Sequence, residues 1–98
     1  TNSLEFRNDI GALWENFLIS ERIKHNHYTS SYANMYFWRT HQQKEIDFLE
    51  ERDGKLYAYE FKWGNRKKVR APAVFLENYP NAEFTIIDRN NYFNFLGL

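Results

Sequence analysis

The sequence predicts a mixed three-layer α/β domain whose elements follow the order α-β-β-β-α-β. Three observations predict this fold class. Apolar residues recur at helical spacing near the start of the chain, three strand-like segments follow, and a short helix then precedes one more strand. In this order, a meander of three strands is completed by a helical crossover to a fourth strand of a mixed sheet.

The first helix is predicted over residues 9–24. Its apolar residues recur at the spacing i, i+3, i+4, i+7 and i+8, and they are Ile10, Leu13, Trp14, Phe17 and Leu18. Asn8 or Asp9 can cap its start. Residues 25–34 are polar and show neither a helical nor a strand period, so we expect a loop there. The three histidines of the chain are expected to be polar surface residues.

Three strands are predicted over residues 35–40, 44–51 and 55–63, which are rich in aromatic and branched side chains. The dipeptide Asp53-Gly54 lies between the second and the third. Asp-Gly between two strands is a strong signal for a tight hairpin, because a type I′ turn needs a positive φ at both central residues.

The rest of the chain predicts a basic loop over residues 64–70 and a short helix over residues 71–79, which Pro72 can start. A buried strand is expected over residues 83–88 because its centre is branched. The tail over residues 90–98 is expected to add an edge strand through Tyr92, Phe93 and Phe95.

Length and composition restrict the class of protein. Ninety-eight residues form one domain, and 43% hydrophobic residues with 27% charged residues supply a core. The absence of cysteine excludes a disulfide scaffold, a thiolate zinc site and a cysteine nucleophile. A mean hydropathy of −0.76 indicates no membrane span, and we expect a cytoplasmic protein. Because the chain begins without Met, we expect residues 1–98 to be one domain of a longer protein.

The hairpin register decides where acidic side chains meet. A two-residue loop at Asp53-Gly54 places Asp47 opposite Glu60, and it places Glu45 opposite Lys62. Two opposed carboxylates are destabilising unless something neutralises them. A divalent cation such as Mg²⁺ would do so, since it binds one or two carboxylates together with waters and phosphate oxygens. An acid pair followed by a lysine then suits phosphodiester hydrolysis.

A simpler interpretation stays open at this point. On an exposed sheet face, Glu45 and Lys62 would form an ordinary ion pair, and the two acids would be solvated. A three-residue loop would also move Asp47 to the other face of the hairpin.

Four short motifs carry a resemblance to a known family. They are Gly11-Ala12-Leu13-Trp14-Glu15-Asn16-Phe17, Phe37-Trp38-Arg39-Thr40, Glu45-Ile46-Asp47-Phe48 and Tyr59-Glu60-Phe61-Lys62. In this order, the chain resembles the PD-(D/E)XK superfamily of restriction-endonuclease-like nucleases. More closely, it resembles the uncharacterised C-terminal domain of prokaryotic AAA-type ATPases. Ile46 stands where the proline that names the superfamily would be.

The resemblance implies a role for each matching residue. Asp47 and Glu60 correspond to the metal-binding acids, Lys62 to the catalytic lysine, and Glu15 to an acid that completes the metal site. The carbonyl of Phe61 would be a further ligand. From the residues alone, Glu15 is equally an acid favoured by the helix dipole. The implied cofactor is Mg²⁺ or Mn²⁺, ATP belongs to the missing N-terminal ATPase part, and the implied substrate is nucleic acid, DNA above all.

The predicted loop after the third strand is basic. From Glu60 to Arg70 there are five basic residues and one acid, a net charge of +4. Arg66, Lys67, Lys68 and Arg70 are therefore predicted to bind nucleic acid, with Trp63 or Trp38 as a stacking surface. Since the whole chain has a formal net charge of zero, any such binding must be local. The alternative for this segment is a solvated loop.

The competing function belongs to another class. A nuclease-like fold that cuts nothing could serve as a nucleic-acid-binding or protein-interaction module. The high aromatic content favours exposed rings, and Tyr32, Tyr36 and Trp63 are candidates for such an interface. The sequence leaves a homo-oligomer open.

Overall fold

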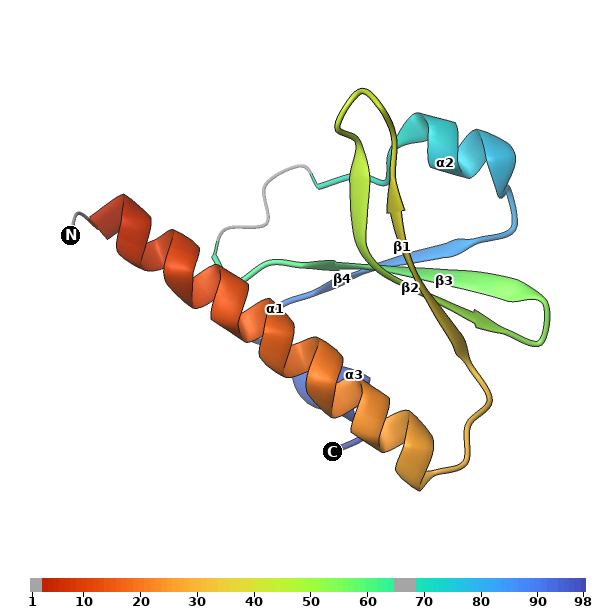
Figure 1. Cartoon of the computed structure of the whole chain (residues 1–98), viewed down its shortest axis with the longest axis horizontal. Helices are drawn as coiled ribbons and strands as arrows, with labels where there is room; N and C mark the ends of the chain where they lie inside the picture. Colours follow the sequence, from red (N-terminus) through yellow and green to blue (C-terminus); the bar gives the residue numbers. More distant parts are fainter. Residues whose placement is uncertain (1–2, 65–68) are drawn as a thin grey trace. The chain divides into compact units, whose positions relative to one another are not determined.

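A computed structural model describes residues 3–64 and 69–98 (Figure 1). The helices are α1 (Ser3–Tyr28), α2 (Ala73–Asn78) and α3 (Tyr92–Leu96), and the strands are β1 (Asn34–Arg39), β2 (Glu45–Arg52), β3 (Lys55–Phe61) and β4 (Glu83–Ile87). The predicted mixed α/β class is confirmed, and the element order is as expected up to β4. Across the described ranges, we find no helix with the length and apolar character needed to traverse a membrane.

The four strands form one sheet in the order β1-β2-β3-β4. β1 pairs with β2, and β2 with β3, in antiparallel fashion. Figure 1 shows β3 and β4 running in the same direction, with α2 in the connection between them. The sheet is therefore mixed, as the predicted helical crossover requires. A β-bulge interrupts the β1–β2 register between Tyr36 and Trp38.

The chain divides into two compact units. The helical unit contains α1, α3 and the described residues among 61–66, together with the segment from Ile87 that precedes α3. The sheet unit contains β1, β2, α2 and nearly all of β3 and β4. Each unit has its own internal contacts, and the kind of contact differs between the two units.

The sheet unit has an aliphatic and aromatic core. Ile46, Leu49, Ala58 and Phe75 are buried, and Phe75 has no exposed surface. Trp38 packs edge-to-face on Phe75, with the ring centroids 5.4 Å apart. A second group of rings joins Phe48 to Tyr59, whose centroids are 6.3 Å apart. Burying a large apolar side chain stabilises a fold by roughly 1.5–3 kcal/mol, so these rings account for much of the stability of this unit.

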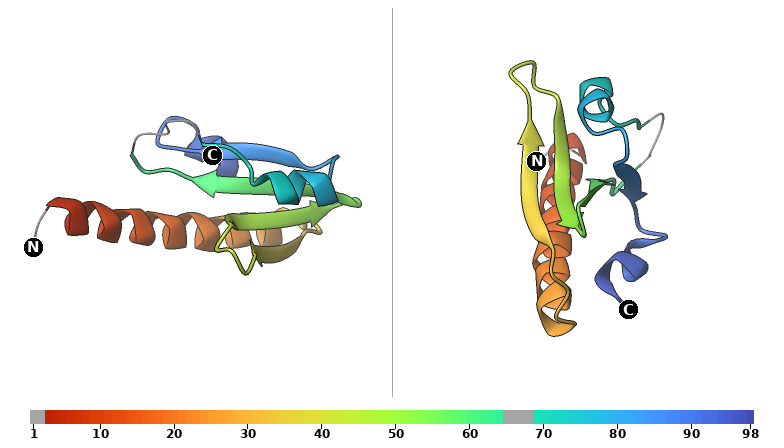
Figure 2. Two further views of the ribbon diagram at one scale, coloured as in Figure 1. Left: turned by 90° about the horizontal axis from the view of Figure 1, so that it is seen from above. Right: turned by 90° about the vertical axis from the view of Figure 1, so that its right-hand side faces the viewer.

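The helical unit is built around α1, which is one uninterrupted helix in Figure 2. Trp14 and Leu18 of this helix are buried. Trp14 packs edge-to-face on Trp63 at 5.5 Å and on Tyr92 at 5.8 Å between ring centroids. Aromatic pairs with this geometry are stabilising beyond the area they bury.

A hydrogen bond joins α1 to the C-terminal helix within this unit. Arg22 Nη1 donates to the carbonyl oxygen of Phe95 at 2.6 Å, and the guanidinium carbon lies 4.7 Å from the centroid of the Phe95 ring. Both Phe95 and Leu96 of α3 are buried. Arg22 thus links the C-terminal half of α1 to α3.

Two predictions about α1 need correction. The helix starts at Ser3 and ends at Tyr28, so it is longer than residues 9–24. Thr29 continues the hydrogen bonding at its end, since both its N–H and its Oγ1 donate to the carbonyl of His25, at 2.9 and 2.8 Å. Asn26 is buried and His25 is half-buried, so tertiary packing holds a polar segment helical and makes His25 more than a surface residue.

The predicted edge strand in the tail is wrong, because residues 92–96 form α3. Tyr92 N–H donates to the carbonyl of Asp88 at 3.1 Å, which starts a helical turn. The adjacent residues Phe95 and Leu96 are both buried, a pattern that fits a helix better than an alternating strand. Gly97 then ends the helix with φ 78°.

The predicted apolar stripe of α1 is only partly buried. Leu13 and Phe17 are exposed, whereas Trp14 and Leu18 are buried. The stripe therefore indicated the helix correctly, but it did not identify which of its members form the core.

Candidate metal and phosphodiester site

The hairpin between β2 and β3 has the predicted register. Arg52 pairs with Lys55, and the ladder continues without a shift to Phe48 opposite Tyr59. Asp53 has φ 53° and Gly54 has φ 78°, so both central residues of the turn have the positive φ that a type I′ turn requires. The three-residue loop that would have moved Asp47 to the other face is thereby excluded.

Asp47 and Glu60 directly follow the last residues of this ladder. The paired residues of the ladder end at Phe48 and Tyr59. Continued by one residue, the same register would set Asp47 opposite Glu60, as the sequence predicts. Both side chains are half-buried, and Oε1 of Glu60 is buried. Each also interacts with other residues of the described chain. The pair is thus held in a partly water-excluded position, which the simpler interpretation of two solvated acids did not expect.

The donor atoms of Asp47 and Glu60 are carboxylate oxygens, which are ligands that divalent cations such as Mg²⁺ prefer. Among residues 3–64 and 69–98, no three or more His, Asp or Glu side chains form a group that could hold a metal ion. Asp47 and Glu60 supply two carboxylates. That number fits Mg²⁺, which binds through one or two carboxylates and completes its shell with waters and phosphate oxygens.

The other predicted site residues lie in the helical unit. Phe61 is the last residue of β3, and its ring packs on Phe95 at 5.6 Å between centroids. Lys62 is half-buried, and its N–H donates to the carbonyl of Ile87 at 2.9 Å. Glu15 is half-buried on α1. Asp47 and Glu60 therefore belong to the sheet unit, and Phe61, Lys62 and Glu15 belong to the helical unit.

The ion pair between Glu45 and Lys62 that the simpler interpretation predicted is wrong. Oε2 of Glu45 instead accepts from Arg39, at 2.7 Å from Nη2 and 3.1 Å from Nε. Arg39 pairs with Glu45 across β1 and β2, so the strand on the other side of β2 supplies the cation. Both side chains are exposed, and such a pair contributes little to stability.

Of the four basic residues predicted to bind nucleic acid, the structure describes only Arg70. Arg66, Lys67 and Lys68 lie outside the described residues. Arg70 is exposed and lines a hollow of about 550 Å³ in the sheet unit with Lys44 and Pro72. The two tryptophans proposed as stacking surfaces are both engaged. Trp38 packs on Phe75 in the core, and Trp63 packs on Trp14.

One cation near the end of β4 was missed by the sequence analysis. The guanidinium carbon of Arg89 lies 4.7 Å from the centroid of the Trp63 ring. Twenty-six residues separate the two in sequence, and no spacing rule links them. Only the pairing of β4 with β3 brings them together, as the hydrogen bond from Lys62 to Ile87 shows.

A buried ion pair in the sheet unit was also missed. Glu50 has no exposed surface and pairs with Arg52, whose guanidinium carbon lies 3.7 Å from the centroid of the Tyr57 ring. Burial opposes the charge of Arg52, but the hydroxyl of Tyr59 and the carboxylate of Glu50 together raise the pKa of this arginine. The alternation of β2 did place Glu50 on the opposite face from Asp47, so this pair is separate from the candidate site.

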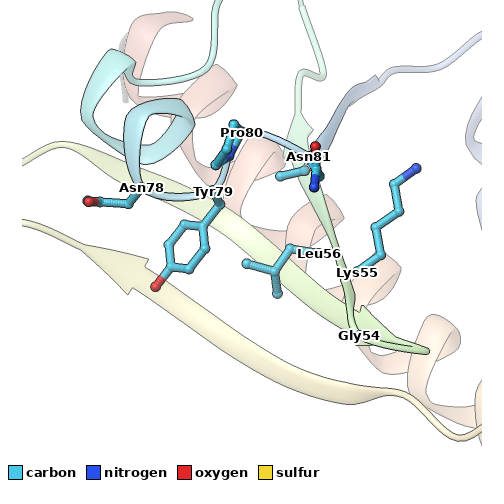
Figure 3. A pocket seen from close by; sticks show the side chains of 8 residues that line it. Gly54, Lys55, Leu56, Asn78, Tyr79, Pro80 and Asn81 are labelled. Atoms are coloured by element: carbon cyan, nitrogen blue, oxygen red, sulfur yellow. The ribbon is translucent and has the colours of Figure 1, made fainter.

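The sheet unit also has a hollow of about 610 Å³ at the turn end of the hairpin (Figure 3). It is lined by Gly54, Lys55, Leu56, Asn78, Tyr79, Pro80, Asn81 and Ala82. Lys55 Nζ donates to Oε2 of Glu83 at 2.7 Å, and this bond raises the pKa of Lys55. Neither Asp47 nor Glu60 lines this hollow, so it does not form part of the acid pair.

The structure is a small mixed α/β domain in which the half-buried Asp47 and Glu60 lie just beyond the end of a hairpin ladder. The chain belongs to the family described as a domain of unknown function, DUF4143, whose model matches residues 10–95. Domains of this family are found in AAA-ATPase-associated proteins. No curated protein and no solved structure matches the chain.

Proposed function

We propose that this domain is a metal-dependent nuclease that hydrolyses nucleic-acid phosphodiester bonds. Asp47 and Glu60 hold Mg²⁺ or Mn²⁺ in this proposal. The observation that supports it is the hairpin register. Continued one residue past Phe48 and Tyr59, this register would set the half-buried Asp47 and Glu60 opposite each other. Such a pair is unfavourable unless a cation neutralises it.

Two further points support the proposal. The motifs around Asp47, Glu60 and Lys62 resemble those of the PD-(D/E)XK superfamily, and the element order up to β4 is the order of its common core. The family to which the chain belongs is associated with AAA-type ATPases, the proteins whose C-terminal domain it resembles. An ATPase part of the same protein would then bind ATP, and the nuclease would act together with it.

The proposed chemistry uses three kinds of group. The bound cation would supply activation of water and stabilisation of charge on a phosphoryl oxygen. Asp47 and Glu60 bind it, with the carbonyl of Phe61 and the carboxylate of Glu15 as the further ligands that the resemblance implies. The ammonium of Lys62 orients the attacking water and neutralises charge that develops on the phosphate.

Calorimetric titration with Mn²⁺ tests the acid pair. We expect the unmodified chain to bind at least one ion, and Asp47→Asn and Glu60→Gln each to lose that binding. Glu45→Gln is the matched control, because it removes a carboxylate from the same strand at an exposed position. Absence of binding in the unmodified chain at millimolar metal, or equal binding by all four proteins, would refute the metal site.

Lys62→Ala separates metal binding from hydrolysis. We expect it to retain Mn²⁺ binding and to lose cleavage of plasmid DNA by roughly 10²-fold or more, since it removes a charge that acts in the transition state. The assay should use the protein that includes the ATPase part. Unchanged cleavage in this variant would remove Lys62 from the mechanism.

An interaction module remains the second candidate, because β1 is an edge strand with exposed rings. Tyr36 is 49% exposed and Phe37 is 75% exposed, and the β-bulge lies between Tyr36 and Trp38. An exposed aromatic edge strand favours pairing with another chain. Under this alternative, Asp47→Asn leaves binding to the partner unchanged, whereas Phe37→Asp abolishes it.

A further inference from the structure

Two basic residues of the helical unit, Lys62 and Arg89, follow the ends of two parallel strands. β3 and β4 run in the same direction, and the hydrogen bond from Lys62 N–H to the carbonyl of Ile87 sets their carboxyl ends side by side (Figure 1). Lys62 directly follows β3, and Arg89 follows β4 by two residues. In open α/β sheets, ligands bind outside the carboxyl ends of the strands.

Arg89 is exposed, yet it is held in place. Its guanidinium carbon lies 4.7 Å from the centroid of the Trp63 ring, and Trp63 is in turn fixed by its edge contact with Trp14. The backbone on both sides of Arg89 is also fixed. Oδ1 of the buried Asp88 accepts from the N–H of Asn90 at 2.8 Å and of Asn91 at 3.2 Å. A guanidinium fixed in this way loses little conformational freedom when it binds a ligand.

The charge of Arg89 is available to a ligand. Within the described ranges, Arg89 takes part in no ion pair and no hydrogen bond of its guanidinium. Asp88, its neighbour in sequence, is engaged with backbone N–H groups. Arg22 provides a contrast, because it also lies over a ring but donates to the carbonyl of Phe95.

We propose that Arg89, held over Trp63, binds a phosphate group of a nucleic-acid strand. The choice of nucleic acid as ligand rests on the proposed nuclease function. The five N–H donors of a guanidinium match a phosphate in a two-pronged geometry, which a lysine cannot provide. Lys62 follows Glu60 by two residues on the same chain segment, so a strand bound at Arg89 lies beside the chain segment that carries, in the sequence, both residues of the proposed reaction, Glu60 and Lys62. Such a contact positions the strand without reading its sequence.

Binding of fluorescent oligonucleotides in EDTA tests this proposal. Anisotropy would be measured with a 20-nucleotide single strand and the corresponding DNA duplex at several salt concentrations. We expect Arg89→Gln to weaken binding about tenfold and to reduce the slope of log K against log salt by about one. Arg89→Lys should have an affinity between those of Arg89→Gln and the unmodified chain, because lysine keeps the positive charge but lacks the planar guanidinium. Lys24→Gln is the control, since it removes one exposed positive charge from α1.

Four outcomes would overturn the proposal. The first two are equal affinity and salt slope for Arg89→Gln and the unmodified chain, and an affinity loss in Lys24→Gln equal to that in Arg89→Gln. The others are competition by polyglutamate as strong as by unlabelled oligonucleotide, and absence of oligonucleotide binding by the unmodified chain. Thermal unfolding confirms that the variants are folded. Because EDTA removes divalent metal, loss of Mn²⁺ binding or cleavage in Asp47→Asn tests the nuclease proposal separately from the phosphate contact.

Discussion

The sheet unit and the helical unit place their functional groups by different physical means. In the sheet unit, an antiparallel ladder with a two-residue turn pairs residues 48–52 with residues 55–59 and leads directly to Asp47 and Glu60, and fully buried side chains such as Phe75 support it. In the helical unit, rings and arginines pack on one another, as Arg22 does on Phe95 and Arg89 on Trp63. The first unit fixes its acids through the backbone, whereas the second fixes its cations through side-chain packing. Substitutions should therefore affect the two units differently.

The largest effect is expected from truncating the core of the sheet unit. Phe75→Ala should reduce the free energy of unfolding by about 3–5 kcal/mol, because this ring is completely buried between Trp38 and Tyr79. Urea denaturation would measure it. Leu76→Ala is the control on the same helix, since Leu76 is exposed. A loss in Phe75→Ala no greater than in Leu76→Ala would show that this core does not hold the sheet unit together.

The buried ion pair should come next. Arg52→Met leaves the carboxylate of Glu50 buried without its cation and should cost roughly 3 kcal/mol. The double variant Arg52→Met/Glu50→Leu should recover much of this loss, because it removes the stranded charge as well. Arg39→Met breaks an exposed pair and should cost less than about 1 kcal/mol. Equal losses in Arg52→Met and Arg39→Met would contradict the structure.

A smaller effect is expected where α3 ends in the helical unit. Gly97 has φ 78°, and a Cβ there would lie 2.2 Å from Cε1 of His25. Gly97→Ala should cost roughly 2 kcal/mol from the backbone strain and the displaced imidazole. Gly54 has the same φ but open space around it, so Gly54→Ala should reduce the free energy of unfolding by only about 1 kcal/mol. The difference in unfolding free energy between Gly97→Ala and Gly54→Ala measures the cost of displacing His25. Equal unfolding free energies would contradict the close approach of His25 to Gly97.

The smallest effect concerns the pH dependence of the hairpin. Asn34 Nδ2 and Gly54 N–H each donate to the carboxylate of Glu51 at 3.0 Å, and these bonds lower the pKa of Glu51 below its ordinary 4.5. A lowered carboxyl pKa adds stability that is present above pH 4.5 and is lost as the pH falls through the folded-state pKa.

Thermal unfolding at pH 7 and pH 3 would measure this effect. The unmodified chain should have a higher Tm than Glu51→Gln at pH 7, and that advantage should shrink at pH 3. Glu77→Gln, at an exposed position of α2, controls for the removal of one acidic residue. A Tm difference for Glu51→Gln that stays constant between the two pH values would show that these hydrogen bonds do not favour the carboxylate.

Much of the sheet unit could be predicted because its determinants are local. Asp53-Gly54 fixes the turn, and the turn fixes the predicted register as far as Phe48 opposite Tyr59. The strands and α2 were found within a few residues of their observed bounds for the same reason. The partner of Glu45 was missed, because it depends on which strand lies on the other side of β2.

By itself, the sequence determined the element order up to β4, the hairpin turn and its register, because each of these depends on residues close together in the chain. Only the tertiary structure decided the helical conformation of the tail, the length of α1 and the position of Arg89 over Trp63. The bond from Arg22 to Phe95 joins residues 73 positions apart. Contacts over such separations depend on the packing of the folded chain, and no periodicity or turn signal encodes them.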